Sequence, residues 1–462
     1  MSQKKQLVVI NIVGLTPSLL GEHTPKINAV INNGFMKPIE GVFPALTTTA
    51  QASMLTGLTA EQHGIVGNGW YFRELAEIHF WKQSNHLMQG KKIWQSLREQ
   101  QTDFSCSQLF WWYNMYAEVD AAITPRPHYP ADGRKVMDLY SSPTGLHQSI
   151  ESKIGKFPFF NFWGPASDIR SSRWIVDCAI KEFDLNQPNL QLVYLPHLDY
   201  NLQRFGPDGP EITKDVKAID TEAGRLINHA HEKGAEIMIV SEYGINNVSQ
   251  SVSINRILRE GGHLRVRQSL SWELLDAGAS TAFAVADHQI AHIYVNDSRQ
   301  LVKIKQLLES THGIEQVLDA KSKKNWHIDH PRSGELIAIA DPGFWFDYYY
   351  WLDDRKAPDF ARTVDIHNKP GYDPLELFLD PDIPAVKLKI IGRLLQKKLG
   401  QRMLMDVIPL DTSLVKGSHG RLADSPENGP LIIFSQPVPD INVSAMTDIA
   451  QLIKKYFISN NK

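Results

Sequence analysis

Three apolar runs with polar residues within two positions of their carboxyl ends limit what this 462-residue chain can fold into. They are Leu7–Val13, Leu190–Leu195 and Glu236–Ser241, and stretches with helical periodicity separate them. Short apolar runs rich in β-branched residues are typical of parallel strands buried on both faces. Strands that alternate with helices predict an open α/β sheet, and in such sheets sites gather at the carboxyl ends of the strands.

Polar residues at five strand-end or turn positions are candidates to converge at that edge: Asn11, Thr47, Asp199, the pair Glu242–Tyr243, and His419. Each residue also has a purely structural interpretation. A carboxylate such as Asp199 can cap a helix or anchor a loop, and His419 can be a hydrogen-bonded loop histidine. The residues alone leave both interpretations open.

Thr47 begins a short predicted helix that ends at Gly57, within the segment from Phe43 to Trp70. A hydroxyl at a helix N-terminus is often only a cap, but the N–H groups and dipole there also favour a phosphate. A threonine hydroxyl is a poor nucleophile at neutral pH unless a base or a metal lowers its pKa. Because no lysine or histidine lies close to Thr47 in the sequence, a divalent metal is the natural activator.

The length exceeds the roughly 250–300 residues that one hydrophobic core usually serves. From about residue 246 the pattern changes to a strand pair at 281–286 and 291–295, a helix at 300–309 and a strand at 313–318. We therefore predict a small α+β unit, residues 246–328, inserted into an α/β core of residues 1–245 and 329–462. In this prediction the core resumes with a strand at Gly334–Ala340, followed by late strands at 407–409 and 431–434.

Composition restricts the partners and the compartment. A net charge of −3 gives no sign of a nucleic-acid or anionic-membrane surface. Cys106 and Cys178 make no disulfide framework and show no metal-ligand spacing, which suits a reducing compartment. No apolar run approaches the roughly 18–20 residues of a membrane span, and Leu7–Val13 is too short for a signal peptide. We predict a cytoplasmic protein without a membrane span, and the sequence does not indicate its oligomeric state.

Two segments are unusually aromatic, Phe110–Tyr116 and Phe344–Trp351. Either could line a pocket for a bulky, ring-containing or lipid-like group, and either could be an aromatic core cluster.

Five stretches, in order along nearly the whole chain, resemble the type I phosphodiesterase and nucleotide pyrophosphatase family of the alkaline phosphatase superfamily. The Gly67-Asn68 pair is also shared with phosphonoacetate hydrolase, a relative in that group. The stretches are Phe43–Gly64 around Thr47, Tyr194–Pro207 with Asp199, Ile239–Gly244, His330–Gly343, and Gly417–Ile433 with His419.

The resemblance implies an alkaline-phosphatase-like α/β fold, two divalent metals, usually zinc, and a phosphorylated threonine intermediate on a small phosphorylated substrate. Thr47 matches the nucleophile. Asp199, Gln203 and His419 match the ligands of one metal; Asn11, Glu242 and Tyr243, with Thr47, match those of the other. The family asparagine that holds the phosphate corresponds to Ala50, so Gln51 is the candidate to replace it, and Asn68 is a second substrate-binding candidate.

Only Thr47, Asp199 and His419 are retained as the family has them. Asn11 and Glu242 stand where the family has aspartate, and Gln203 and Tyr243 where it has histidine. Zinc prefers nitrogen and thiolate ligands, whereas amide and carboxylate oxygens suit Mg²⁺, Mn²⁺ or Ca²⁺. We therefore expect one or two divalent ions, zinc by resemblance or a harder cation from the oxygen-rich set.

Three hypotheses remain. The first is a metal-dependent phosphodiesterase or pyrophosphatase with a remodelled site that uses Thr47. The second is a degenerate relative that binds a phosphorylated ligand without hydrolysis. The third is that other residues refill the site: Asp287-His288, His292, His367 or His197.

Overall fold

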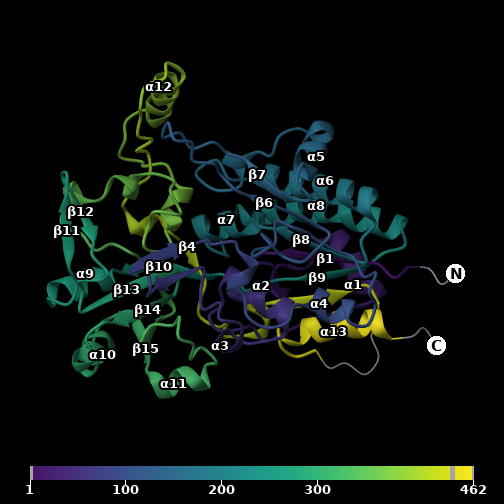
Figure 1. Cartoon of the computed structure of the whole chain (residues 1–462), viewed down its shortest axis with the longest axis horizontal. Coiled ribbons are helices and arrows are strands. Elements are labelled where there is room, and N and C mark those ends of the chain that lie inside the picture. Colours follow the sequence, from purple (N-terminus) through teal and green to yellow (C-terminus); the bar gives the residue numbers. More distant parts are fainter. Residues whose placement is uncertain (1–3, 437–442, 460–462) are drawn as a thin grey trace.

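The three apolar runs form adjacent parallel strands at the centre of an eight-stranded sheet in the computed structural model, which describes residues 4–436 and 443–459 (Figure 1). Residues 1–3, 437–442 and 460–462 of the predicted core lie outside the described residues. The order across the sheet is β2 (Phe35–Pro38), β19 (Leu431–Phe434), β9 (Glu236–Val240), β1 (Leu7–Ile12), β8 (Leu190–Leu195), β5 (Cys106–Leu109), β6 (Ala121–Pro125) and β7 (Leu139–Ser142).

Strands β9, β1, β8, β5 and β6 are parallel, and the antiparallel pairs lie toward the edges of the sheet. Every residue of β1 and β8 is buried, because helices cover both faces. The predicted fold class, a mostly parallel α/β sheet flanked by helices, is confirmed.

Two groups of helices cover the sheet (Figure 1). On one face, α6 and α1 pack on the long α8, with α5 and α7 beside them; on the other face, α13 packs on α2 and α4. Their bounds are α1 (Pro25–Asn33), α2 (Thr47–Thr56), α4 (Ile93–Arg98), α5 (Leu146–Ile154), α6 (Ile169–Asn186), α7 (His197–Phe205), α8 (Ile212–Glu232) and α13 (Asp448–Ile458).

A second lobe, at the left of Figure 1, contains a four-stranded antiparallel sheet. Its order is β13 (Ala282–Asp287), β14 (Ile290–Val295), β16 (Leu336–Ala340) and β15 (Ile314–Leu318). The strand predicted at Gly334–Ala340 exists as β16, and it pairs with β14 and β15 and not with the strands of the central sheet. An apolar run that is buried on both faces looks the same in either sheet. The division of the chain at 246 and 328 stays a prediction.

A small sheet lies between the two lobes. It contains the strand that directly precedes His419. In it, β10 (Asn246–Val252) pairs with β17 (Gly343–Phe346) and with β18 (Gly417–Ser418). The predicted strand at 407–409 was wrong: the segment is irregular, and the N–H of Ile408 donates to the carbonyl of Arg362 without a ladder around it.

The remaining elements lie mainly around the second lobe and the loops near the site. They are α3 (Ala60–His63), β3 (Gly69–Phe72), β4 (Glu77–Phe80), α9 (Ile254–Glu260), β11 (Val266–Ser269), β12 (Trp272–Leu275), α10 (Leu301–Glu309), α11 (Ala320–Asn325) and α12 (Val386–Lys398). Within the described ranges, none of the helices combines the length and the apolar character needed to cross a bilayer.

Candidate functional site

Thr47 is the first residue of α2, and it lines a pocket at the carboxyl edge of the central sheet. Its Oγ1 lies 2.8 Å from the hydroxyl of Tyr243. The two following threonines are structural, because the Thr48 hydroxyl donates to the Gly67 carbonyl and the Thr49 hydroxyl to that of Ile65. Of these three threonines, only Thr47 lines the pocket.

Glu242 lies behind Thr47 as the centre of a fully buried amide cluster. Its Oε1 accepts from the side-chain amides of Asn11, at 2.6 Å, and Gln51, at 2.7 Å. The Gln51 amide is fixed from its other end, since its Oε1 accepts from the backbone N–H of Trp112 at 2.7 Å. Both amides therefore present N–H groups, not oxygens, to the carboxyl group.

Asp199 has a similar arrangement on α7. The Nε2 of Gln203, one helical turn later, donates to Asp199 Oδ2 at 2.8 Å, and the hydroxyl of Tyr372 donates to Gln203 Oε1 at 2.8 Å. His419 is oriented by a 2.8 Å hydrogen bond from Nδ1 to the carbonyl of Ala45, so in the neutral ring Nε2 is the acceptor. That Nε2 lies 4.0 Å from Asp199 Oδ1.

Four rings stack across the site and join its two sides. His419 packs against Tyr243, with ring centroids 3.6 Å apart and planes at 10°, and against His288, at 3.8 Å. His288 then packs against Tyr372 at 3.6 Å, and its Nδ1 lies 2.8 Å from Asp287 Oδ1. The third hypothesis named His288, and the turn between β13 and β14 carries it from the second lobe into the pocket.

Burial displaces the pKa values of these groups because the charged forms lose their hydration. Burial raises the pKa of Glu242 to about 8, although the hydrogen bonds from Gln51 and Asn11 and the nearby Thr47 hydroxyl oppose the shift. Burial likewise raises the pKa of Asp199 to about 7, against the hydrogen bond from Gln203. The pKa of the Tyr243 phenol is held well above 10 by burial and by nearby carboxylates, and burial lowers that of His419 well below 6.5.

These residues do not fit the two zinc ions that the resemblance implies. Among residues 4–436 and 443–459, no three His, Cys, Asp or Glu side chains lie together in a way that could hold a metal. Glu242 and Asp199 belong to different sets of predicted metal ligands, one set for each ion. Each carboxylate already accepts hydrogen bonds from side-chain amide N–H groups. Three buried oxygens have no hydrogen-bond partner: Asn11 Oδ1, Asp199 Oδ1 and Glu242 Oε2. A cation bound by either predicted ligand set would nevertheless meet only one carboxylate.

Chelation is expected to leave the melting temperature of the protein unchanged, because the amide N–H groups already satisfy one oxygen of each carboxylate. The measurement is a thermal melt with and without EDTA, together with the metal content of the purified chain. An Asn11→Asp variant places two carboxylates in contact, so it should melt earlier and be restored by Zn²⁺ or Mn²⁺. Asn11→Leu is the control that loses the N–H without gaining charge. Stoichiometric metal whose removal lowers the melting temperature of the wild-type chain would contradict the expectation.

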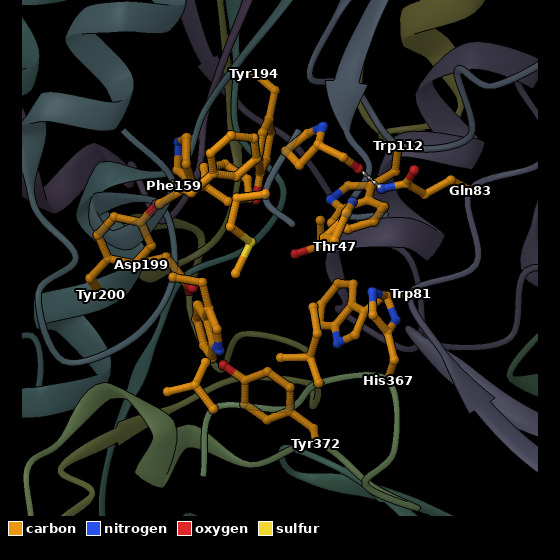
Figure 2. Close-up of a pocket in the computed structure, with 18 of the residues that line it drawn as sticks. Thr47, Trp81, Gln83, Trp112, Phe159, Tyr194, Asp199, Tyr200, His367 and Tyr372 are labelled. Atoms are coloured by element: carbon orange, nitrogen blue, oxygen red, sulfur yellow. Dashed lines mark hydrogen bonds between the residues drawn. The ribbon is translucent and has the colours of Figure 1, made fainter. Parts of the chain in front are cut away.

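Aromatic and apolar side chains form the walls of the pocket, and Figure 2 shows Thr47 facing the space between Trp81 and Trp112 on one side and Phe159 and Tyr200 on the other. The rings of Trp81 and Trp112 lie 4.9 Å apart. Lys135 is the one lysine or arginine among the lining residues, all of which belong to the described chain. The pocket therefore suits a ligand with an apolar or aromatic portion.

The other predicted residues lie at or near the site in different roles. His367 lines the pocket, whereas His292 bonds to the carbonyl of Val66 and His197 faces Asp215. Asn68 is held by Asp287 and accepts from the N–H of Thr48, so it braces the start of α2.

The aromatic segments separate in the structure. In Phe110–Tyr116, Trp112 lines the pocket while Phe110, Trp111 and Tyr113 are core residues. None of Phe344–Trp351 lines the pocket; its buried rings belong to the core of the second lobe. Sequence reasoning missed Trp81, Trp163 and Tyr372, which come from loops with no motif, so no local signal could have found them.

A buried ion cluster supports the wall that carries Tyr372. Lys369 Nζ lies 2.7 Å from a carboxylate oxygen of both Asp373 and Glu376. Glu376 also accepts from the indole N–H of Trp163 at 2.6 Å, so one cluster positions two pocket rings.

Two curated yeast proteins are similar to this chain. The first, an uncharacterised pyrophosphatase/phosphodiesterase of Schizosaccharomyces pombe, is 23% identical over 245 residues, which are 52% of this chain and 42% of that protein. The second, ectonucleotide pyrophosphatase/phosphodiesterase 2 of Saccharomyces cerevisiae, is 23% identical over 343 residues, 70% of this chain and 58% of that one. The chain thus spans about half the length of these relatives.

Solved structures share the fold at low identity. An inactive variant of murine ectonucleotide pyrophosphatase/phosphodiesterase 5 in complex with AMP matches with a TM-score of 0.59 and 15% identity, covering 99% of this chain and 96% of that one. Phosphonoacetate hydrolase of Sinorhizobium meliloti in complex with phosphonoacetate matches with a TM-score of 0.61 and 12% identity, covering 98% and 95%. The family model for type I phosphodiesterase/nucleotide pyrophosphatase matches residues 7–373. This chain therefore belongs to the type I phosphodiesterase/nucleotide pyrophosphatase family.

Proposed function

We propose that this protein hydrolyses small phosphoric esters or anhydrides whose leaving group has an apolar or aromatic portion, with Thr47 as the nucleophile. The observation that carries the proposal is the Thr47 hydroxyl at the N-terminus of α2, open to an aromatic-walled pocket. The helix N-terminus favours the phosphoryl group, and the aromatic walls favour the organic group attached to it.

The chemistry can be written with the chain's own groups. Thr47 Oγ forms the bond to phosphorus, the bond from phosphorus to the leaving oxygen breaks, and the Thr47 proton passes through Glu242 to that oxygen. Glu242 Oε2 is a buried oxygen without a hydrogen-bond partner, so it is free to take up and release this proton. Water then attacks the phosphothreonine, and one of its protons restores the Thr47 hydroxyl. The net reaction adds one water across the phosphorus–oxygen bond.

A second candidate function is binding of a phosphorylated ligand without turnover. The observation that favours it is the weakness of the available bases. With a pKa of about 8, Glu242 is mostly protonated at neutral pH, and the pKa of Tyr243 is held above its usual value. The AMP complex concerns a relative, and AMP is one probe for this candidate.

The deciding experiment measures turnover of a chromogenic aryl phosphodiester and of a nucleoside diphosphate by the wild-type chain and by Thr47→Ala. Turnover that disappears in the variant supports hydrolysis through Thr47. Binding of AMP or of the diester without turnover in the wild-type chain would favour the second candidate.

The cytoplasmic location stays a prediction.

Replacing Trp81 or Trp112 by alanine is expected to raise KM for an aryl phosphodiester by about tenfold, since one aromatic contact contributes about 0.5–1.5 kcal/mol beyond its buried area. The effect on kcat should be smaller, because neither ring takes part in the proposed bond-making and proton-transfer steps. Steady-state kinetics on an aryl and a methyl diester measure it, with the exposed Leu270→Ala as control. An equal loss on both diesters would assign the tryptophans a structural role instead.

A further inference from the structure

We propose that α12 (Val386–Lys398) is a docking helix for an anionic lipid surface. The helix carries five basic residues and no acidic one, in the sequence VKLKIIGRLLQKK. None of its residues is buried. Figure 1 shows it at the top of the view, away from both sheets. This surface is distinct from the pocket, and the proposal does not rest on the proposed hydrolysis.

An apolar stripe runs along the outer side of α12. Leu388, Ile391, Leu395 and Leu399 follow each other at intervals of three or four residues, which places them on one face of a helix. Their exposed fractions are 68%, 52%, 56% and 76%. Single exposed leucines need no explanation, but a continuous exposed stripe marks a surface that another apolar phase covers.

The inner side of the helix explains why the stripe points outward. Val386 and Ile390 are partly buried against the core of the second lobe. Lys389 and Arg393 both pair with Asp406, at 2.8 and 3.1 Å. These contacts hold the helix by the opposite side and leave the apolar stripe facing solvent.

The charge around the stripe selects the occupant. Lys387, Lys397 and Lys398 are exposed and make no ion pair with any described residue. A helix with an apolar stripe and a basic polar side lies in the plane of a bilayer surface, where it buries its apolar side chains and attracts anionic headgroups. A second copy of this chain would bring the same lysines together, so charge complementarity favours the lipid surface. The net charge of −3 is a sum over the whole chain, so it does not show this local basic patch.

The experiment is co-sedimentation of the 462-residue chain with vesicles of phosphatidylcholine alone and of phosphatidylcholine with phosphatidylglycerol. We expect binding to the anionic vesicles that weakens as salt is added, and much weaker binding to the neutral vesicles. The variant with Leu388, Ile391, Leu395 and Leu399 all changed to glutamine should lose at least about tenfold in partition, because glutamine keeps helix propensity while removing the apolar area.

Two controls separate this docking from other causes. Leu270→Gln and Val302→Gln change exposed apolar residues elsewhere, 87% and 67% exposed, and should bind like the wild type. Turnover of a soluble diester by the glutamine variant should be unchanged, so a failure of docking and a failure of hydrolysis are distinguishable. Equal partition of the glutamine variant, no binding of the wild type to anionic vesicles, or a dimer that the glutamine variant loses would each overturn the proposal.

Discussion

Thr47→Ala is expected to reduce turnover of a phosphodiester by about 10⁴-fold or more, because removing one member of a catalytic group that acts as a unit costs about 10⁴- to 10⁶-fold. The reason is chemical: alanine has no oxygen to bond phosphorus. The structural loss should be about 1 kcal/mol, since the variant removes one hydrogen bond to a pocket-facing hydroxyl, that of Tyr243. Steady-state kinetics and a thermal melt measure the two effects.

Thr49→Ala is the matched control, because it removes one buried hydroxyl from the same helix, bonded to the carbonyl of Ile65 at 3.0 Å. It should lose a comparable amount of stability and keep its turnover. Thr47→Ser retains an oxygen and should retain measurable activity. Turnover in Thr47→Ala equal to that of the wild type would show that the reaction uses another group.

Glu242→Gln is expected to make the protein more stable than the wild type at pH 8.5. The carboxyl group has a pKa of about 8 in the folded chain and an ordinary value of 4.5, so the folded state holds a proton that the unfolded state has released. The wild type therefore loses stability as pH rises from about 4.5 to 8, by roughly 3–5 kcal/mol. Glutamine has no such proton, and its Oε1 can still accept from Asn11 and Gln51.

Urea unfolding at pH 5, 7 and 8.5 measures this difference. The gap between variant and wild type should widen in favour of the variant up to about pH 8 and then level off. Glu260→Gln, at an exposed position, should follow the wild type at every pH. If Glu242 held a cation, the glutamine variant would instead be the less stable protein at high pH. The same experiment therefore tests, independently of EDTA, whether the wild-type chain binds a stabilising metal at Glu242.

The order of strands and helices was largely readable from the sequence. The runs Leu7–Val13, Leu190–Leu195 and Glu236–Ser241 became β1, β8 and β9, because a run buried on both faces needs no knowledge of its neighbours to be recognised. The sequence did not show which strands pair with one another. The apolar Leu336–Ala340 joined the second sheet, and Val407-Ile408 is buried without forming a strand. Which edge a strand pairs with depends on residues far away in the sequence.

The convergence of several predicted residues was also readable from the sequence, but the direction of their hydrogen bonds was not. Motif order placed Asn11, Thr47, Asp199 and His419 together, and the structure brings them to one edge of the sheet. The sequence could not show whether an amide presents its oxygen or its N–H. For Gln51 that choice depends on the backbone N–H of Trp112, 61 residues away.

The sequence by itself determined the α/β fold, the family, and Thr47 as the hydroxyl at the start of α2, because each depends on local periodicity or on short motifs. Tertiary structure alone decided the pocket walls, the arrival of His288 from the second lobe and the amide N–H groups on both carboxylates. It also decided that the apolar side of α12 faces outward. These features depend on which surfaces meet when distant segments pack, and burial, pKa and hydrogen-bond direction follow from that packing.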